Sequence, residues 1–171
     1  MCFLSARYDG ELMNEAQAQA LTELLQIQEI AALGTLHDGE PYVSMVPFAL
    51  HPGGFVIHVS QLAAHTKDML STPAVSLLVI APPEPDEPPQ ARPRVTIQGI
   101  AARCLESDPR HSAAKAAYLT RFPDSAPMFG FADFSLFIIE PRQARFVGGF
   151  GQATSVGAET LKEIGVRATF S

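Results

Sequence analysis

The chain has 171 residues, of which 47% are hydrophobic, so it is long enough for one domain with a substantial core. Its formal net charge of −6 at pH 7 excludes the broad basic surface that nucleic-acid binding requires. No apolar run approaches the roughly 20 residues of a membrane-spanning helix, and the start of the chain lacks the pattern of a signal peptide, which predicts a cytoplasmic protein without a membrane partner.

The first half of the chain predicts two helices and three short strands. Asn14 is a suitable N-cap for an amphipathic helix. The pair Asp38-Gly39 lies between two β-rich runs and is typical of a tight hairpin turn. In chain order, the expected elements are a helix over 14–28, strands over 30–36, 41–50 and 55–59, and a short helix over 60–70.

The second half predicts further strands around a proline-rich, acidic loop at 82–93. Gly99 suggests a bulge, and Asp108-Pro109 is typical of a helix start. The expected elements are strands over 75–80, 94–105, 134–140 and 143–150, a helix over 108–120 and a short terminal helix over 159–165. Six or seven short strands with few helices predict a mainly β protein with a small closed antiparallel sheet. We expect a single domain over 1–171, with its core at about 14–153 and a tail at 154–171.

The junction between the strand at 55–59 and the following helix is a candidate ligand site. The first N–H groups of a helix lack partners and carry partial positive charge, which favours an anion such as a phosphate. Ser60 and Thr66 add hydroxyl donors, Lys67 adds a cation, and His65 adds a ring that donates or accepts. In the simpler interpretation Ser60 only caps the helix, while His65 and Lys67 face solvent. The loop also lacks the glycines of a P-loop or Rossmann motif.

Five motifs together resemble a known family, the FMN-binding split barrels related to pyridoxamine 5'-phosphate oxidase, and within it a short form of the haem-utilisation (HugZ-like) branch. In order they are LGTLHDGEPYVSMVPF at 33–48, SQLAAHTKD at 60–68, RVTIQG at 94–99, GFADF at 130–134 and RFVGGFGQA at 145–153. Each motif is weak alone, but five in register cover most of 30–153. The resemblance implies a six-stranded antiparallel split β-barrel, a homodimer with FMN at the subunit interface, and a flavin-dependent oxidoreductase of unknown substrate.

The resemblance also implies which residues bind FMN. Val46, Pro47 and Phe48 suit a flat apolar wall for the flavin ring, although Val46 and Phe48 are equally typical of a core. Arg94 would add a second cation for the phosphate, or it may simply end a strand. The chain departs from the oxidase branch at Ala49 and His65, where that branch has cations, so pyridoxal phosphate specificity is not implied. The full expected set is Ser44, Met45, Val46, Pro47, Phe48, Ala49, Val59, Ser60, His65, Thr66, Lys67 and Arg94.

The haem-utilisation branch supplies an alternative function, haem binding or haem use. His37 and His51 lie in predicted turns and are expected to be solvated, so His65 would contact the iron if haem is bound. Family members that degrade haem place a ligand histidine in the C-terminal segment, whereas no histidine follows His111 here. Asp133 matches the acidic residue expected beside that ligand. Haem is therefore ranked below FMN as the predicted cofactor.

A third alternative is a flavin binder without catalytic activity. No paired carboxylates and no nucleophile with a base occur at a persuasive spacing, so catalytic residues remain unknown and any chemistry must come from a cofactor. The only cysteines, Cys2 and Cys104, cannot build a disulfide framework or a cysteine metal site, and no metal site is predicted.

Overall fold

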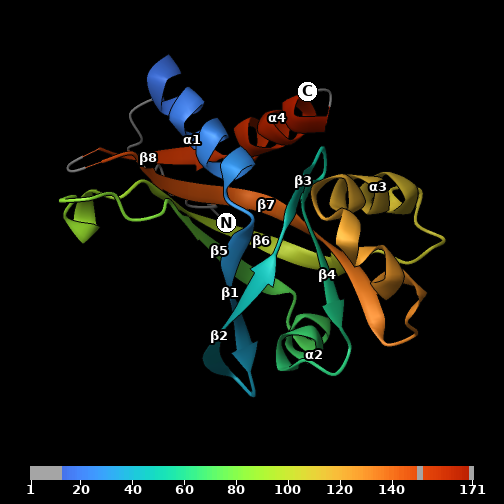
Figure 1. The fold of residues 1–171 in the computed structure, drawn as a ribbon. Coiled ribbons are helices and arrows are strands. Elements are labelled where there is room, and N and C mark those ends of the chain that lie inside the picture. Colours follow the sequence, from blue (N-terminus) through green and yellow to red (C-terminus); the bar gives the residue numbers. More distant parts are fainter. Residues whose placement is uncertain (1–12, 150–151, 170–171) are drawn as a thin grey trace, which may run out of the picture.

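The structure is a computed structural model that describes residues 13–149 and 152–169. Cys2 lies outside these ranges, as do residue 150 of the predicted strand 143–150 and residues 150–151 of the motif 145–153. The described chain is mainly β, with helices packed around a curled antiparallel sheet (Figure 1). Its strands are β1 (Ile30–His37), β2 (Glu40–Pro47), β3 (Ala49–His51), β4 (Gly54–Ser60), β5 (Ala74–Ile80), β6 (Arg94–Arg103), β7 (Phe134–Val147) and β8 (Ala153–Gly157).

The described residues form fewer helices than strands, and most of the helices are short. They are α1 (Glu15–Ile27), α2 (Ala64–Ser71), α3 (His111–Arg121) and α4 (Ala158–Thr169), with 3-10 turns η1 (Pro89–Ala91) and η2 (Pro123–Gly130). The predicted cap is confirmed at α1, where Asn14 and Gln17 form a reciprocal capping box. None of the helices in 13–149 and 152–169 has the length and apolar character needed to cross a membrane.

The sheet order explains why the strand count differs from the prediction. The strands follow the order β2-β1-β5-β6-β7-β4-β3, and β8 pairs with β7. Only Phe48 separates β2 from β3, yet these two strands lie at opposite ends of that order, so the sheet must curl back toward itself. The predicted strand 41–50 is therefore two strands, broken at Phe48. With the unpredicted β8, the described sheet has eight strands instead of six.

A second correction concerns β7, which was predicted as two strands. It runs without interruption through Pro141, because a bulge in the pairing with β6 falls there. Gly99 pairs with Pro141 and Gln98 pairs with Gln143, so Arg142 is the extra residue. A bulge is one of the few places where a sheet tolerates proline, and a Cβ on Gly99 would lie only 2.7 Å from the carbonyl oxygen of Glu140.

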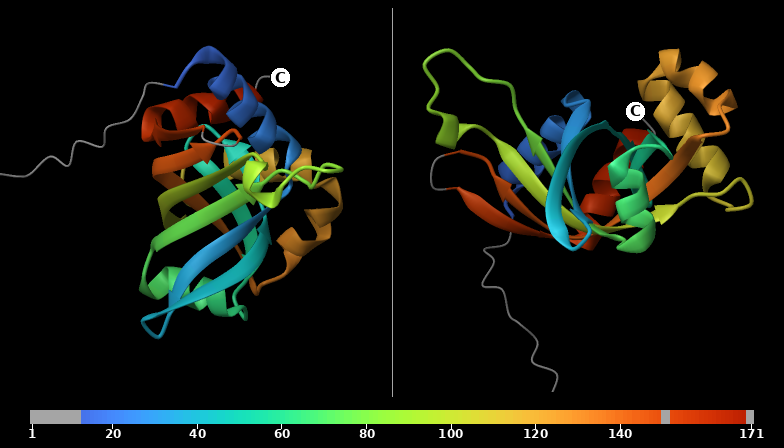
Figure 2. Two further views of the ribbon diagram at one scale, coloured as in Figure 1. Left: turned by 90° about the vertical axis from the view of Figure 1, so that its left-hand side faces the viewer. Right: turned by 90° about the horizontal axis from the view of Figure 1, so that it is seen from below.

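Two groups of helices cover the sheet. Leu21 and Leu25 of α1 and Leu161 and Ile164 of α4 pack into the main core, and the two helices lie together at one end of the sheet (Figures 1 and 2). In contrast, α3 and η2 cover part of the other face, where a second apolar cluster forms. That cluster contains Ala49, Val56, Cys104, Ala114, Tyr118, Leu136 and Ile138.

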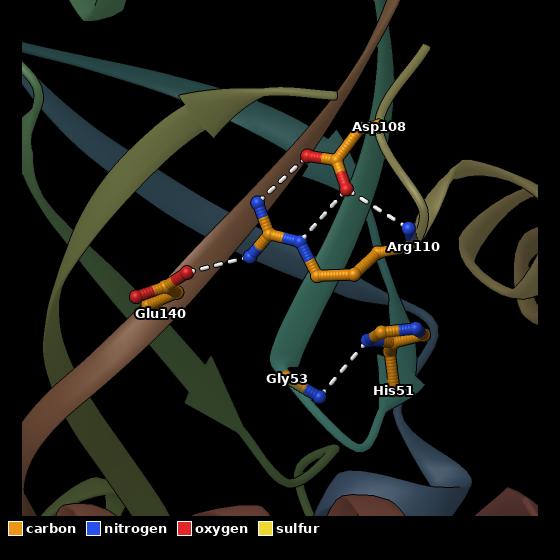
Figure 3. A network of polar contacts seen from close by, with 5 residues as sticks. All are labelled: His51, Gly53, Asp108, Arg110 and Glu140. Carbon is orange, nitrogen blue, oxygen red and sulfur yellow. Dashed lines mark hydrogen bonds and ion pairs between the residues drawn. The ribbon is translucent and has the colours of Figure 1, made fainter. Parts of the chain in front are cut away.

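The start of α3 also differs from the prediction, since the helix begins at His111 and not at Asp108-Pro109. Asp108 does not cap a helix but binds Arg110, whose backbone N–H and guanidinium both donate to its carboxylate at 2.8 to 3.0 Å (Figure 3). The same guanidinium donates to Glu140 on β7 at 2.7 Å. This network joins the start of α3 to the sheet, and Arg110 lowers the pKa of Asp108 to about 2.

The Asp108 contacts predict a specific response to acid. Because the folded pKa is depressed, the carboxylate stabilises the fold above its usual pKa of 3.8, and this contribution is lost as the pH falls toward 2. In a carbon-detected NMR titration we expect Asp108 to titrate near pH 2. In Arg110→Gln its pKa should rise toward 3.8. An Asp108 that titrates near 3.8 in the unmodified protein contradicts the network.

Candidate functional site

The β1-β2 hairpin and helix α2 together position the main candidate site. Asp38 and Gly39 form the turn with φ angles of 51° and 85°, as their turn propensity predicts. The turn lets β1 and β2 pair over their full length, from Ile30 opposite Pro47 to His37 opposite Glu40. Helix α2 packs against this hairpin at the lower edge of the molecule in Figure 1.

A buried carboxylate on α2 orients a histidine of β1. The Asp68 side chain is only 5% exposed, accepts a hydrogen bond from Thr35 Oγ1 at 2.8 Å, and lies 2.7 Å from His37 Nδ1. Because a carboxylate only accepts, His37 Nδ1 carries the proton, and in the neutral ring the lone pair is on Nε2. The His37 side chain is 48% exposed. This places an oriented imidazole at the surface, with its Nε2 atom 3.9 Å from the carboxylate of Asp38 in the turn.

The protonation of this pair follows from the same contacts. The hydrogen bond to Asp68 raises the pKa of His37 above 6.5. Burial alone would raise the pKa of Asp68, but the hydrogen bonds from His37 and Thr35 outweigh it and lower that pKa. Asp68 is therefore a carboxylate at neutral pH, and it holds the ring orientation in either protonation state of His37.

Only some of the features expected of the predicted phosphate site are present at the start of α2. Helix α2 begins at Ala64, four residues after Ser60, and no side chain caps it. Ser60 instead accepts a hydrogen bond from the Leu62 N–H at 3.1 Å and donates to Asp133 at 3.3 Å. Thr66 is 1% exposed and donates to the Ser60 carbonyl, so its hydroxyl hydrogen is already used. The Asp133 carboxylate adds negative charge beside Ser60, which disfavours a phosphate there.

His65 and Lys67 have different surroundings on the same helix. Lys67 is exposed, and no ion pair engages it within the described ranges. His65 Nε2 is buried without a hydrogen-bond partner, and burial lowers the pKa of its ring although Asp68 acts in the opposite direction. Ser44 Oγ on β2 is likewise buried without a partner. Buried polar atoms without partners are uncommon in proteins, and these two belong to residues of the predicted site.

The apolar residues of the predicted set mostly belong to the core. Val46 and Phe48 are 1% and 0% exposed, so their side chains lie in the core, and the flavin contact expected of this segment stays a prediction. Ala49 and Val59 are buried as well. Met45 is exposed and Pro47 is half-buried. The backbone of β2 remains available along its outer edge, because β2 pairs only with β1 in the sheet.

Arg94 is far from α2 within one chain. It is opposite Val147 on β7, whereas Ser60 is opposite Phe134, thirteen residues away along the same strand. At about 3.3 Å per residue this separation is on the order of 40 Å along the strand. The Arg94 guanidinium donates to the carbonyl groups of Gln90 and Arg92 in the 82–93 loop. Arg94 and Lys67 of one chain therefore do not bind the same phosphate.

An exposed apolar surface lies beside the hairpin. Tyr42 packs its ring 5.6 Å from the His37 ring, and the neighbouring residues of β2 also project into solvent. Tyr42 and His37 share one side of the hairpin, as their positions in the strand pairing require. Four large apolar residues are exposed on the other side, which we call the hairpin face: Ile30, Leu36, Val43 and Met45, with exposures from 40% to 67%. A shallow groove of about 680 Å³ continues from Tyr42 and Val43 toward β5 and β6.

The contact between His37 and Asp68 could not be predicted from the sequence. The position of His37 beside Asp38-Gly39 predicted a solvated turn residue, and Asp68 is 31 residues away in sequence. No local signal links the two, since the contact depends on how α2 packs against β1. The histidine predicted to bind iron, His65, instead has its Nε2 buried.

Comparison with known proteins gives a consistent picture. The family described as pyridoxamine 5'-phosphate oxidase matches residues 17–148. The chain is 38% identical over 128 residues to the chloroplastic heme oxygenase HOZ of Arabidopsis thaliana, which covers 74% of this chain but 38% of that protein. It is 29% identical over 143 residues to heme oxygenase HutZ of Vibrio cholerae, covering 82% of this chain and 81% of HutZ.

Among solved structures, a heme binding protein from Mycobacterium smegmatis superposes with a TM-score of 0.78 and 27% identity. The match covers 89% of this chain and 62% of that one. The chain thus spans about two fifths of the Arabidopsis protein and just over three fifths of the mycobacterial chain. The printed names of all three proteins refer to haem.

Proposed function

Because the chain belongs to the pyridoxamine 5'-phosphate oxidase family, and because its matched relatives are named for haem, we propose that it binds haem and that His37 is the iron ligand. The observation that carries this proposal is the contact between His37 Nδ1 and the buried Asp68 carboxylate. Histidines that bind metals commonly donate their second N–H to a carboxylate, which fixes the ring and makes the ligand more basic.

The residues around His37 fit the other requirements of haem. A porphyrin needs an apolar surface, and the Tyr42 ring lies 5.6 Å from the His37 ring on the same side of the hairpin. Its propionates need a cation, and Lys67 is exposed on the same helix as Asp68. Bound haem would supply a redox-active iron. The chain would hold the ring of His37 through Asp68 and balance charge through Lys67.

His37 is preferred over His65, the iron ligand predicted from the sequence. The Nε2 atom of His65 is buried and would need a movement of α2 to reach an iron, whereas His37 is 48% exposed. His51 accepts a hydrogen bond from Gly53 through Nδ1 and is only 5% exposed. His58 is 8% exposed and stacked between aromatic rings.

Flavin binding is the second candidate function. It is favoured by the uncapped start of α2, whose N–H groups and nearby Lys67 suit a phosphate. Against it stand the Asp133 carboxylate beside Ser60 and the remote position of Arg94. An FMN site would need cations from a second subunit. Flavin-dependent oxidoreductase activity, its substrate and a cytoplasmic location stay predictions.

A side-by-side titration with haemin and FMN tests the proposed cofactor. We expect haemin to bind with about one equivalent per chain and a sharpened Soret band, and FMN to bind much more weakly. Stoichiometric FMN binding, with flavin fluorescence quenched and no specific haemin complex, would show that the second candidate is correct.

We also propose that the chain forms the predicted homodimer of split barrels, with the curled sheet as the barrel and the hairpin face at the subunit contact. Four large apolar residues exposed on one side of an edge hairpin are typical of a protein interface and not of a free surface. The unpartnered Ser44 Oγ lies on the same strand. β2 also leaves the backbone groups along one of its sides without a strand partner in the described chain.

The dimer proposal predicts the effect of a charge on this face. Val43 is 67% exposed, and in Val43→Glu we expect a monomer in light scattering, because the new carboxylate would be buried without a partner at the contact. Val166→Glu is the matched control, since Val166 is 41% exposed on α4, away from the hairpin. If both variants keep the mass of the unmodified protein, the hairpin face is not the subunit contact.

A further inference from the structure

A separate cavity of about 360 Å³ is lined by residues from the ends of β4, β6 and β7 and from the α3-η2 segment. Helix α3 lies at the right of the molecule in Figure 1. The lining of the cavity shares no residue with the His37 cluster or with the predicted cofactor set. The proposed haem function makes no use of it. We call it the α3 cavity.

One buried polar atom in the wall of the α3 cavity lacks a partner. His58 lines the cavity and is 8% exposed, and no hydrogen bond within the described residues reaches its Nδ1 atom. A buried donor or acceptor without a partner is costly, and such atoms in a cavity wall are typically satisfied by a bound molecule. The cavity therefore requires a polar group at its inner end.

Aromatic rings fix the position of His58. Its ring stacks on Phe129 with a centroid distance of 3.8 Å and an angle of 3° between the planes, and Phe134 lies 5.1 Å away. Burial, with a smaller contribution from Lys115, lowers the pKa of His58 to about 4. The ring is therefore neutral at pH 7, with one nitrogen that donates and one that accepts. The wall is rigid and flat, which suits a planar ligand.

The mouth of the α3 cavity carries uncompensated positive charge. Arg103 and Lys115 line it together with one carboxylate, Glu106. Neither cation takes part in an ion pair within 13–149 and 152–169. Lys115 Nζ lies 4.9 Å from the centre of the Phe129 ring, so its charge is held beside the aromatic wall. This local excess of cations contrasts with the net charge of −6 and favours an anionic ligand.

We infer that the α3 cavity binds a small aromatic carboxylate that carries a hydroxyl group at its far end. The carboxylate meets Arg103 and Lys115 at the mouth, and the ring packs along the aromatic wall. The hydroxyl group reaches the unpartnered Nδ1 atom of His58. Each part of the ligand thus matches one feature of the cavity. The volume of the α3 cavity lies at the small end of the usual range for ligand pockets, roughly 300 to 1,000 Å³.

The test uses 4-hydroxybenzoate as the probe and the full chain, with binding followed by calorimetry and by NMR of labelled histidine rings. We expect saturable binding, with the ring signals of His58 shifted and those of His37 unchanged. Benzyl alcohol, which lacks the carboxylate, should bind at least about tenfold more weakly.

Two variants locate the bound probe. Lys115→Gln should weaken 4-hydroxybenzoate at least about tenfold, and Lys162→Gln on α4 should leave binding unchanged. The inference is overturned if the probe does not shift His58, or if the two variants weaken it equally. Haemin binding in Lys115→Gln separates this inference from the proposed function, because the haem site lies elsewhere and should be unaffected.

Discussion

Replacing His37 by alanine is expected to lower haem affinity on the order of 100-fold, and to change the Soret band to that of haem without a protein imidazole. The reason is that His37 is the surface imidazole held by a buried carboxylate, through the 2.7 Å contact with Asp68. Loss of an outer partner of a metal ligand typically costs 10- to 100-fold in affinity, so loss of the ligand itself should cost at least the upper part of that range. Haemin titration followed by absorption measures both effects.

Three further variants show whether the effect is specific to ligation. Asp68→Asn should cost roughly tenfold, because His37 remains but loses its carboxylate partner. His111→Ala, a half-exposed histidine on α3, should bind haem normally. Free imidazole should restore the spectrum of His37→Ala. If His65→Ala abolishes the specific spectrum and His37→Ala does not, then the iron ligand predicted from the sequence is correct and His37 is not the ligand.

Phe137→Ala is expected to lower the free energy of unfolding by about 3 to 5 kcal/mol. Phe137 is completely buried in the main core and lies on β7, where it is opposite Ile57 of β4 and Arg103 of β6. Removing its ring leaves a cavity at the strand that joins both halves of the sheet. Urea denaturation at one fixed protein concentration measures the loss, since any dimer makes the midpoint depend on concentration.

Phe131→Ala is the matched control for this measurement. Phe131 is 54% exposed, so its truncation should change the free energy of unfolding by less than about 1 kcal/mol. Equal losses in the two variants would mean that Phe137 is not in the main core as the structure describes it. That result would contradict the pairing of β7 with both β4 and β6.

Local signals in the sequence predicted local structure well. The Asn14 capping box starts α1 and the Asp38-Gly39 turn closes the hairpin, because both depend on contacts within a few residues. The predictions failed where distant segments decide the outcome. β7 continues through Pro141 because its bulge depends on pairing with Gly99 of another strand. Asp108 binds Arg110 and does not cap α3, and Arg110 is in turn held by Glu140 on β7.

The role of the predicted site residues in binding a cofactor stays a prediction. The region around α2 and β2 does hold unpartnered polar atoms, at Ser44 and His65. The sequence could not show that Val46 and Phe48 point into the core, nor that Arg94 lies far along the sheet. Both depend on how the sheet curls, which the break at Phe48 determines.

The ranking of cofactors changed for a physical reason. From the sequence, FMN ranked above haem because no histidine follows His111 to serve as the expected ligand. The structure presents a different imidazole at the surface, made suitable by Asp68 and Thr35 through contacts that no motif encodes. The relatives named for haem support the same choice, and the predicted FMN site is weakened by the carboxylate of Asp133 beside Ser60.

Resonance Raman spectroscopy of the reduced haem complex tests the iron ligand most directly, because the stretching vibration of an iron-imidazole bond reports the bond itself. We expect this band in the unmodified protein, its loss in His37→Ala and a shift in Asp68→Asn, where the ring loses its carboxylate partner. A band that persists unchanged in His37→Ala would contradict the account.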